Sequence, residues 1–144
     1  MDSYVLGFAF DLDGQVALIQ KNRPEWQEGH LNGIGGQLDD GEGHQMAMAR
    51  EFFEETGVMT QPGDWDYRGI MRGEDWMVHV FSMTSVNVSS VQTTTDEEVY
   101  LLHPDGIGGF SIEAIENVKA LIELCRIPVS QPSGRYPTFE MQYS

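Results

Sequence analysis

Residues 36–58 read GQLDDGEGHQMAMAREFFEETGV, and this stretch carries the densest chemical pattern of the 144-residue chain. Its second half, from Gln45 to Thr56, predicts an α-helix, because apolar side chains recur at helical spacing and Gly57 follows as a stop signal. The apolar stripe expected on this helix consists of Met46, Ala47, Ala49, Phe52 and Phe53.

Three glutamates share one face of this helix. Side chains three or four residues apart lie on one helical face, so Glu51 stands beside both Glu54 and Glu55. Like charges at this spacing destabilise a helix by roughly 0.2–0.5 kcal/mol per pair. The helix alone favours a merely solvated acidic face. The other interpretation is a cradle for Mg²⁺, which prefers carboxylate oxygens and keeps waters beside substrate phosphates.

The segments that flank the helix favour the cradle. Gly33, Gly35 and Gly36 allow sharp bends that bring backbone carbonyls close to a ligand. Glu42 stands eight residues before Arg50, where it can hold the guanidinium group by two hydrogen bonds. A glycine-rich loop, a carboxylate helix and a glycine stop therefore form one functional unit.

This unit resembles the Nudix box. The box consists of a glycine, five residues, a glutamate, seven residues, Arg-Glu, an apolar residue, one residue, Glu-Glu, one residue, a glycine and an apolar residue. Every specified position is filled, by Gly36, Glu42, Arg50, Glu51, Phe52, Glu54, Glu55, Gly57 and Val58. The matched stretch covers 23 of 144 residues, and an accidental match at nine positions is very improbable.

The resemblance implies the Nudix fold, an α/β/α sandwich around a mixed β-sheet, and an enzyme that hydrolyses nucleoside diphosphates linked to another group. It implies that Mg²⁺, or Mn²⁺ in its place, is held by the carboxylates of Glu51, Glu54 and Glu55 and by the carbonyl of Gly35. Such a cation screens the diphosphate charge, polarises a phosphoryl oxygen and activates a water for attack on phosphorus.

The same resemblance gives the other box residues supporting roles. Arg50 and Glu42 would orient the glutamates, and Gly36 and Gly57 would shape the backbone around them. Arg50 therefore counts with the glutamates among the expected catalytic residues.

A further acidic residue is expected in a late loop of Nudix enzymes, as a metal ligand or a base. Asp96-Glu97-Glu98 lies about where it should, and alignment by eye with the oxidised-purine triphosphatases of the family selects Glu97. Asp96 and Glu98 remain alternatives for this role, and solvation of a loop tip is the alternative for all three.

Residues before the box are candidates for substrate binding. Lys21 and Arg23 could hold terminal phosphates, although a surface pair at a strand end explains them nearly as well. Asn32, in the sequence LNGIGG, resembles the asparagine with which oxidised-purine triphosphatases read a base edge. An amide offers the donor and the acceptor that this needs. The alternative is an asparagine that serves the turn before Gly33.

The substrate class stays open between two alternatives. The Asn32 segment and the short N-terminus favour a MutT-like hydrolase of a nucleoside triphosphate, oxidised or otherwise non-standard forms included. Two departures weaken this: Gln37 stands where many such enzymes have lysine, and residues 101–109 show no counterpart of their tryptophan-centred base-recognition segment. The alternative substrates are ADP-ribose, a dinucleotide or a nucleotide sugar. A third hypothesis, an idle nucleotide-binding module, usually requires lost box glutamates, and all are present.

Charge and composition exclude several classes of partner. The chain has 23 acidic and 8 basic side chains, a net charge of −15, so it repels duplex nucleic acid and anionic lipid. It has no apolar run near the roughly 20 residues of a membrane span and no signal peptide, so we expect a cytoplasmic protein. For its oligomeric state we expect a monomer or a homodimer. Cys125, its single cysteine, excludes an intramolecular disulfide and is expected to be a buried thiol.

The rest of the chain predicts one domain, residues 1–144, with a mixed sheet covered by helices on both faces. Asp13-Gly14 and residues 72–75 are turn signals that join neighbouring strands into hairpins. His79 lies within a strand pattern, which favours a structural position over proton transfer. The tail from about residue 130 is either a strap or partly disordered. The expected strands cover residues 4–10, 15–21, 65–71, 76–84 and 98–102, and a second helix runs from Ser111 to Cys125.

Overall fold

A mixed β-sheet is the centre of the computed structural model, which describes residues 1–126 and 138–143. Within these residues the sheet has eight strands, in the order β3-β2-β1-β6-β5-β8, with β4 also paired to β1 and β7 to β2. The strands are β1 (Asp2–Phe10), β2 (Val16–Gln20), β3 (Leu31–Asn32), β4 (Ile34–Gln37), β5 (Asp66–Arg72), β6 (Trp76–Thr84), β7 (Val99–Leu102) and β8 (Phe139–Gln142).

Both predicted hairpins are confirmed. β1 and β2 pair antiparallel across a turn in which Gly14 has φ +83° and the Asp11 carboxylate accepts from the N–H groups of Asp13 and Gln15. β5 and β6 form the second antiparallel pair. β1 runs parallel to β6 and β5 parallel to β8, which makes the sheet mixed, as the sequence predicted.

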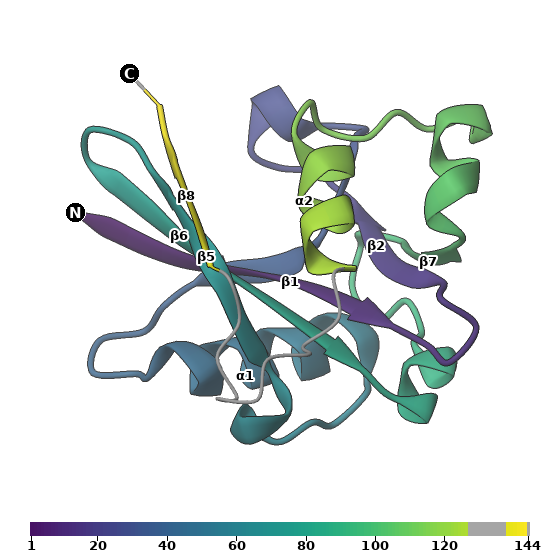
Figure 1. Ribbon diagram of the computed structural model, residues 1–144, viewed down its shortest axis with the longest axis horizontal. Coiled ribbons are helices and arrows are strands. Elements are labelled where there is room, and N and C mark those ends of the chain that lie inside the picture. The colour runs from purple at the N-terminus through teal and green to yellow at the C-terminus, as the bar shows by residue number, and fades with distance from the viewer. Residues whose placement is uncertain (127–137, 144) are drawn as a thin grey trace.

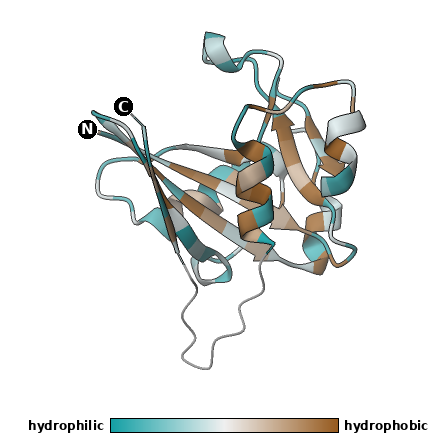
Figure 2. Ribbon diagram, turned by 45° about the horizontal axis from the view of Figure 1, so that its top comes forward, coloured by the Kyte–Doolittle hydropathy of each residue, from teal (hydrophilic) through white to brown (hydrophobic). Residues whose placement is uncertain are grey.

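Two α-helices of the described residues cover opposite faces of this sheet (Figure 1), α1 (His44–Thr56) on one side and α2 (Val118–Cys125) on the other. Each packs against its own hydrophobic cluster. Each helix buries two large side chains almost fully, Met48 and Phe52 on α1 and Leu121 and Ile122 on α2. Burial of each such side chain stabilises the fold by roughly 1.5–3 kcal/mol. Figure 2 shows the hydrophobic residues concentrated on the strands and on α2. The expected α/β/α arrangement is confirmed.

The apolar face expected for α1 was partly wrong. Met46 and Phe53 are 59% and 47% exposed, whereas Met48 is fully buried. The side chains that face the sheet follow the spacing Met48, Phe52, Thr56, and the Thr56 hydroxyl donates to the Phe52 carbonyl. Met46 and Phe53 are seven residues apart and share the opposite, solvent-facing side.

The second helix begins later than the sequence predicted. Asn117, not Ser111, is the residue at its N-terminus, and α2 starts at Val118. The segment before it pairs with β3 instead: Leu31 donates its N–H to the Glu113 carbonyl, and Ile115 donates to the Leu31 carbonyl. Pairing with a distant strand thus overrides a locally helical pattern. A 3₁₀ helix, η4 (Pro104–Gly109), precedes this segment.

The cysteine agrees with a further expectation, and the structure describes one part of the tail. Residues 139–142 form the edge strand β8, and the Tyr143 hydroxyl accepts from the Asn117 amide at 2.8 Å. The preceding part of the predicted tail, residues 130–137, lies outside the described residues. Cys125 is buried, which raises the pKa of its thiol to about 12. In the described part of the chain, no helix is both long and apolar enough to cross a bilayer.

Candidate active site

Arg50 joins the loop after β4 to helix α1. Its Nε and Nη2 donate to the two carboxylate oxygens of Glu42 at 2.7 and 2.9 Å, and Nη2 also donates to the Gln37 carbonyl at 3.2 Å. The hydrogen bonds from Arg50 hold the pKa of the Glu42 carboxyl below its usual range. The two-point contact expected from the spacing of these residues is therefore present.

The same guanidinium group also contacts two glutamates of the helix. Arg50 Nη1 donates to Glu51 at 2.9 Å and lies 3.3 Å from a Glu54 oxygen. A single cation thus bridges carboxylates that would otherwise repel one another. These partners raise the pKa of Arg50 still further above its usual value, so it is permanently charged.

Two glycines allow β4 to lie directly against its neighbours. A Cβ atom on Gly36 would lie 2.5 Å from the Glu51 carboxylate, and one on Gly35 would lie 1.9 Å from the Val5 carbonyl oxygen. Gly57 ends α1 in the left-handed conformation, φ +77°, and donates its N–H to the Phe53 carbonyl. Each of these glycines occupies a position where a side chain would collide or strain the backbone.

Glu55 is a partly buried carboxyl with an unusual environment. Among the residues that the structure describes, its Oε2 has no hydrogen-bond partner. Burial raises the pKa of Glu55 to about 7, Lys21 opposes this rise, and Glu51, Glu97 and Glu54 add to it. Burial also raises the pKa of Glu51, against the opposing effect of Arg50. The fold therefore concentrates negative charge at this end of α1.

Glu97 comes from a distant loop into the same region. It is only 4% exposed, and its carboxylate accepts from Lys21 Nζ at 3.2 Å and from the Asn22 N–H at 2.6 Å. Its neighbours in the acidic triplet are used differently, since Asp96 pairs with Arg23 and Glu98 accepts from the Tyr100 hydroxyl. Of the three, Glu97 is the one buried beside the box.

The expected substrate-binding residues lie in three different settings. Lys21 is 16% exposed and pairs with Glu97, whereas Arg23 is 63% exposed and pairs with Asp96. The Asn32 amide is engaged at both ends, since its oxygen accepts from the Gly33 N–H and its nitrogen donates to Gln27. Asn32 lies in β3, and each end of its amide keeps capacity for a further hydrogen bond.

The sequence analysis missed two contributors to the site. One is the Asn22 backbone N–H on Glu97, and the other is Thr94, whose hydroxyl donates to the Glu54 carbonyl at 2.6 Å. The Ser/Thr-rich composition just before the acidic triplet was the available signal for Thr94. A backbone donor leaves no signal in the sequence. His79, by contrast, lies in a strand as expected, and in β6 it is buried.

The donor set suits a hard divalent cation. Carboxylate and carbonyl oxygens are the ligands that Mg²⁺ and Mn²⁺ prefer, and the unpartnered Glu55 oxygen lacks the positive partner that a cation would supply. Across residues 1–126 and 138–143, no three Asp, Glu, His or Cys side chains stand grouped as a metal centre. Arg50 instead holds Glu51 and Glu54 by ion pairs.

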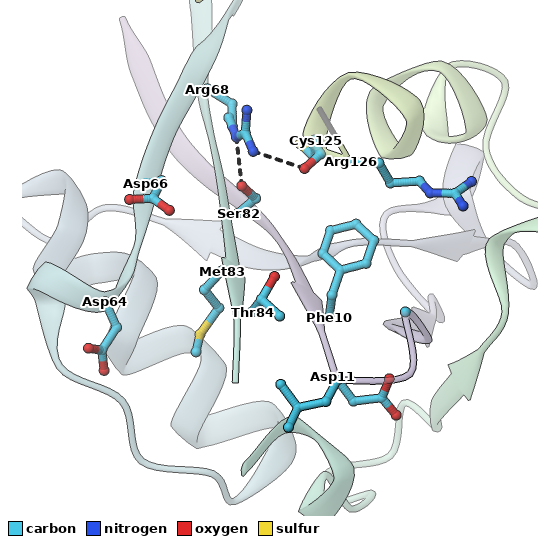
Figure 3. Close-up of a pocket in the computed structure, with 12 residues that line it drawn as sticks. Phe10, Asp11, Asp64, Asp66, Arg68, Ser82, Met83, Thr84, Cys125 and Arg126 are labelled. Carbon is cyan, nitrogen blue, oxygen red and sulfur yellow. Dashed lines mark hydrogen bonds between the residues drawn. The ribbon is translucent and has the colours of Figure 1, made fainter. Parts of the chain in front are cut away.

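A separate cavity of about 540 Å³ lies between the ends of β1, β5 and β6 and the end of α2 (Figure 3). The buried Arg68 guanidinium donates there to the Ser82 hydroxyl and the Cys125 carbonyl. No residue of the glutamate site is among the described residues that line this cavity. Asp11, a further lining residue, caps the β1–β2 turn, so the contacts seen there are structural.

Comparison with known proteins bears on the family and the fold. A profile of the NUDIX domain matches residues 2–115. MutT from Bacillus halodurans has a TM-score of 0.65 at 20% identity, over 85% of this chain and 80% of its own. A MutT structure described for Aliivibrio salmonicida and Vibrio cholerae has a TM-score of 0.71 at 17% identity, over 86% and 96%.

A third similar structure is the NUDIX domain of Shewanella oneidensis NrtR in complex with ADP ribose. Its TM-score is 0.66 at 15% identity, over 86% of this chain and 85% of its own. At such identities the three structures show a common fold. The domain profile spans most of the sequence, including the complete box, and the chain therefore belongs to the Nudix hydrolase family.

Proposed function

We propose that this chain is a divalent-cation-dependent pyrophosphohydrolase that cleaves a phosphoanhydride bond of a nucleoside triphosphate, oxidised or otherwise non-standard forms included. The observation that carries the proposal is the buried, unpartnered Glu55 oxygen in the field of Glu51 and Glu97. A merely solvated acidic face would have its carboxylates in water, each with hydrogen bonds.

In this proposal the carboxylates of Glu51, Glu54, Glu55 and Glu97 and the carbonyl of Gly35 hold Mg²⁺, for which Mn²⁺ can substitute. The bound cation screens the phosphate charge and polarises the phosphoryl oxygen. Arg50 acts through the glutamates. Its contacts with Glu42 and with the Gln37 carbonyl fix the position of its guanidinium group. The positive charge of that group then pairs with Glu51 and Glu54.

Lys21 and Arg23 supply positive charge for the substrate. Both follow β2 closely and both contact the Asp96–Glu97 turn, so their side chains stand beside the carboxylates that would hold the cation. Two positively charged side chains here suit the phosphate-rich tail of a triphosphate better than a diphosphate flanked by two sugars, which favours the triphosphate as substrate. Asn32 would contact the base.

A second candidate substrate is ADP-ribose or a related dinucleotide or nucleotide sugar. The NrtR structure supports it, because that protein holds ADP ribose on the same fold at a TM-score of 0.66. The two substrate classes leave different products: a triphosphate gives a monophosphate and pyrophosphate, whereas ADP-ribose gives two monophosphates.

The test is a screen of the purified chain with Mg²⁺ against nucleoside triphosphates, oxidised triphosphates, ADP-ribose and dinucleotides, with the products separated by anion-exchange chromatography. We expect turnover of a triphosphate to a monophosphate and pyrophosphate, highest at mildly alkaline pH, and none with excess chelator. The Glu55→Gln variant serves as a matched background for contaminating enzymes. Full turnover in chelator would remove the cation from the mechanism, and binding without turnover of any compound would indicate an idle module.

A further inference from the structure

Lys21 and Glu97 form an ion pair that is largely shielded from water. The Lys21 Nζ atom lies 3.2 Å from Glu97 Oε1, and the two side chains are 16% and 6% exposed. The other Glu97 oxygen accepts from the Asn22 N–H at 2.6 Å. Since screening by solvent is weak at such exposure, this pair interacts more strongly than an ion pair on the surface.

The charge of Lys21 also reaches Glu55. Among the charged groups that shift the Glu55 pKa, Lys21 is the positive one, and Glu51, Glu97 and Glu54 are the negative ones. Glu55 has no hydrogen bond to its Oε2 within the described residues. The Lys21 ammonium is thus a positive charge of the chain that acts on both Glu97 and Glu55.

We propose, on the basis of the function proposed above, that Lys21 is an exchangeable internal counter-ion. Its ammonium neutralises Glu97 where no divalent cation is bound, leaves Glu97 when a divalent cation binds there, and then holds a substrate phosphate. This adds a step to the phosphate-binding role expected from the sequence, because it makes Lys21 a competitor of the cation.

Two physical arguments support the exchange. Within one carboxylate cluster a divalent cation and an ammonium group would be only a few ångströms apart and would repel each other strongly. Binding both at Glu97 therefore costs free energy. Lysine is also suited to move, because it carries a compact charge on a flexible four-carbon stem. A substrate phosphate is a strong acceptor for the displaced ammonium.

Three accounts of Lys21 predict different changes in cation affinity when its charge is removed. An exchangeable counter-ion competes with the cation, so its loss tightens binding. A purely structural lysine positions Glu97, so its loss weakens binding. A lysine that contacts only the substrate phosphate leaves binding unchanged when no nucleotide is present. The sign of the change therefore separates the three.

The experiment compares Lys21→Met with Lys119→Met, which removes the chain's other lysine from an exposed position. Mn²⁺ affinity is measured by isothermal titration calorimetry without nucleotide, and thermal midpoints are measured with and without Mg²⁺. For Lys21→Met we expect Mn²⁺ binding tighter on the order of tenfold, a lower midpoint without metal because Glu97 loses its partner, and a larger Mg²⁺-induced rise. Lys119→Met should stay close to the original chain in all three.

A second variant keeps the inference testable if Lys21→Met does not fold. Lys21→Arg retains the charge and adds a two-point contact to the carboxylate, so it is harder to displace and Mn²⁺ should bind more weakly than to the original chain. Weaker or unchanged binding in Lys21→Met, or unchanged binding in Lys21→Arg, overturns the inference. Because no nucleotide is present, this result stands apart from the substrate screen, whose failure alone would reject the hydrolase.

Discussion

Glu55 is the residue at which burial and negative charge conflict most directly. Burial raises its pKa to about 7 from the usual 4.5, so the unfolded state releases the proton first as pH rises. The stability available below about pH 4.5 is therefore lost as pH rises to 7. Glu55→Gln removes this loss and should raise the free energy of unfolding at pH 8 by on the order of 2 kcal/mol, measured by urea denaturation in chelator.

The same variant distinguishes a cation site from a solvated acidic face. Without metal, both interpretations allow Glu55→Gln to be stable, but only a cation ligand makes the Mg²⁺-induced rise in thermal midpoint disappear together with turnover. Glu54→Gln, at an exposed position, is the control for stability in chelator and should change little. A normal Mg²⁺ shift and normal activity in Glu55→Gln would reject Glu55 as a ligand.

Gly36 and Gly35 are adjacent residues whose substitutions should have different effects. A Cβ on Gly36 meets the mobile end of the Glu51 side chain at 2.5 Å, whereas a Cβ on Gly35 meets the Val5 backbone oxygen at 1.9 Å. Gly36→Ala should therefore fold, with a stability change below about 1 kcal/mol, because a side-chain end can move away. Its displaced Glu51 should lower kcat at least tenfold. Gly35→Ala should lose several kcal/mol or fail to fold, and circular dichroism with thermal melting compares the two.

At the scale of elements, helix α1 is joined at its first residue to strand β6. The His44 ring stacks on the His79 ring with centroids 3.8 Å apart, and His79 is only 7% exposed. Burial lowers the pKa of His79 to about 4, with His44 and Arg72 adding to the effect. The unfolded chain therefore takes up a proton first as pH falls from 6.5, and the stability present above that pH is lost towards pH 4.

His79→Phe should remove this acid sensitivity. Between pH 7.5 and 4.5 the free energy of unfolding of the original chain should fall by up to about 3 kcal/mol more than that of the variant. The carboxylates titrate in both proteins, so their effect cancels in this difference. Urea unfolding at both pH values measures it, with His103→Gln, an exposed histidine, as the control. Equal losses in His79→Phe and the original chain would mean that His79 titrates normally in the folded state.

At the scale of the whole molecule, a net charge of −15 on 144 residues favours expansion of the folded chain by self-repulsion. Raising NaCl from 0.02 to 0.5 M shortens the Debye length from about 20 Å to about 4 Å and should therefore raise the thermal midpoint by several degrees in chelator. Sodium sulfate at matched ionic strength separates screening from specific ion effects. A midpoint that falls with salt would show that the ion pairs around Arg50 and Lys21 outweigh the repulsion.

Local spacing in the sequence was sufficient for the parts of the site whose partners are close in the chain. Arg50 meets Glu42 because eight residues of loop and helix place them together, and Gly57 ends α1 because glycine tolerates the left-handed conformation. The two hairpins follow from their turn residues for the same reason. Those interactions act within a few residues, so they are visible as motifs.

The features that the sequence did not predict depend on segments that meet only in the folded chain. The late start of α2 results from the pairing of residues 113–115 with Leu31, and the solvent-facing position of Met46 and Phe53 results from which side of α1 the sheet covers. The Lys21–Glu97 pair and the burial of Glu55 likewise depend on how distant elements pack. The sequence determined which chemical groups the Nudix box carries. The tertiary structure determined which of those groups are buried, and burial is what sets their charge interactions.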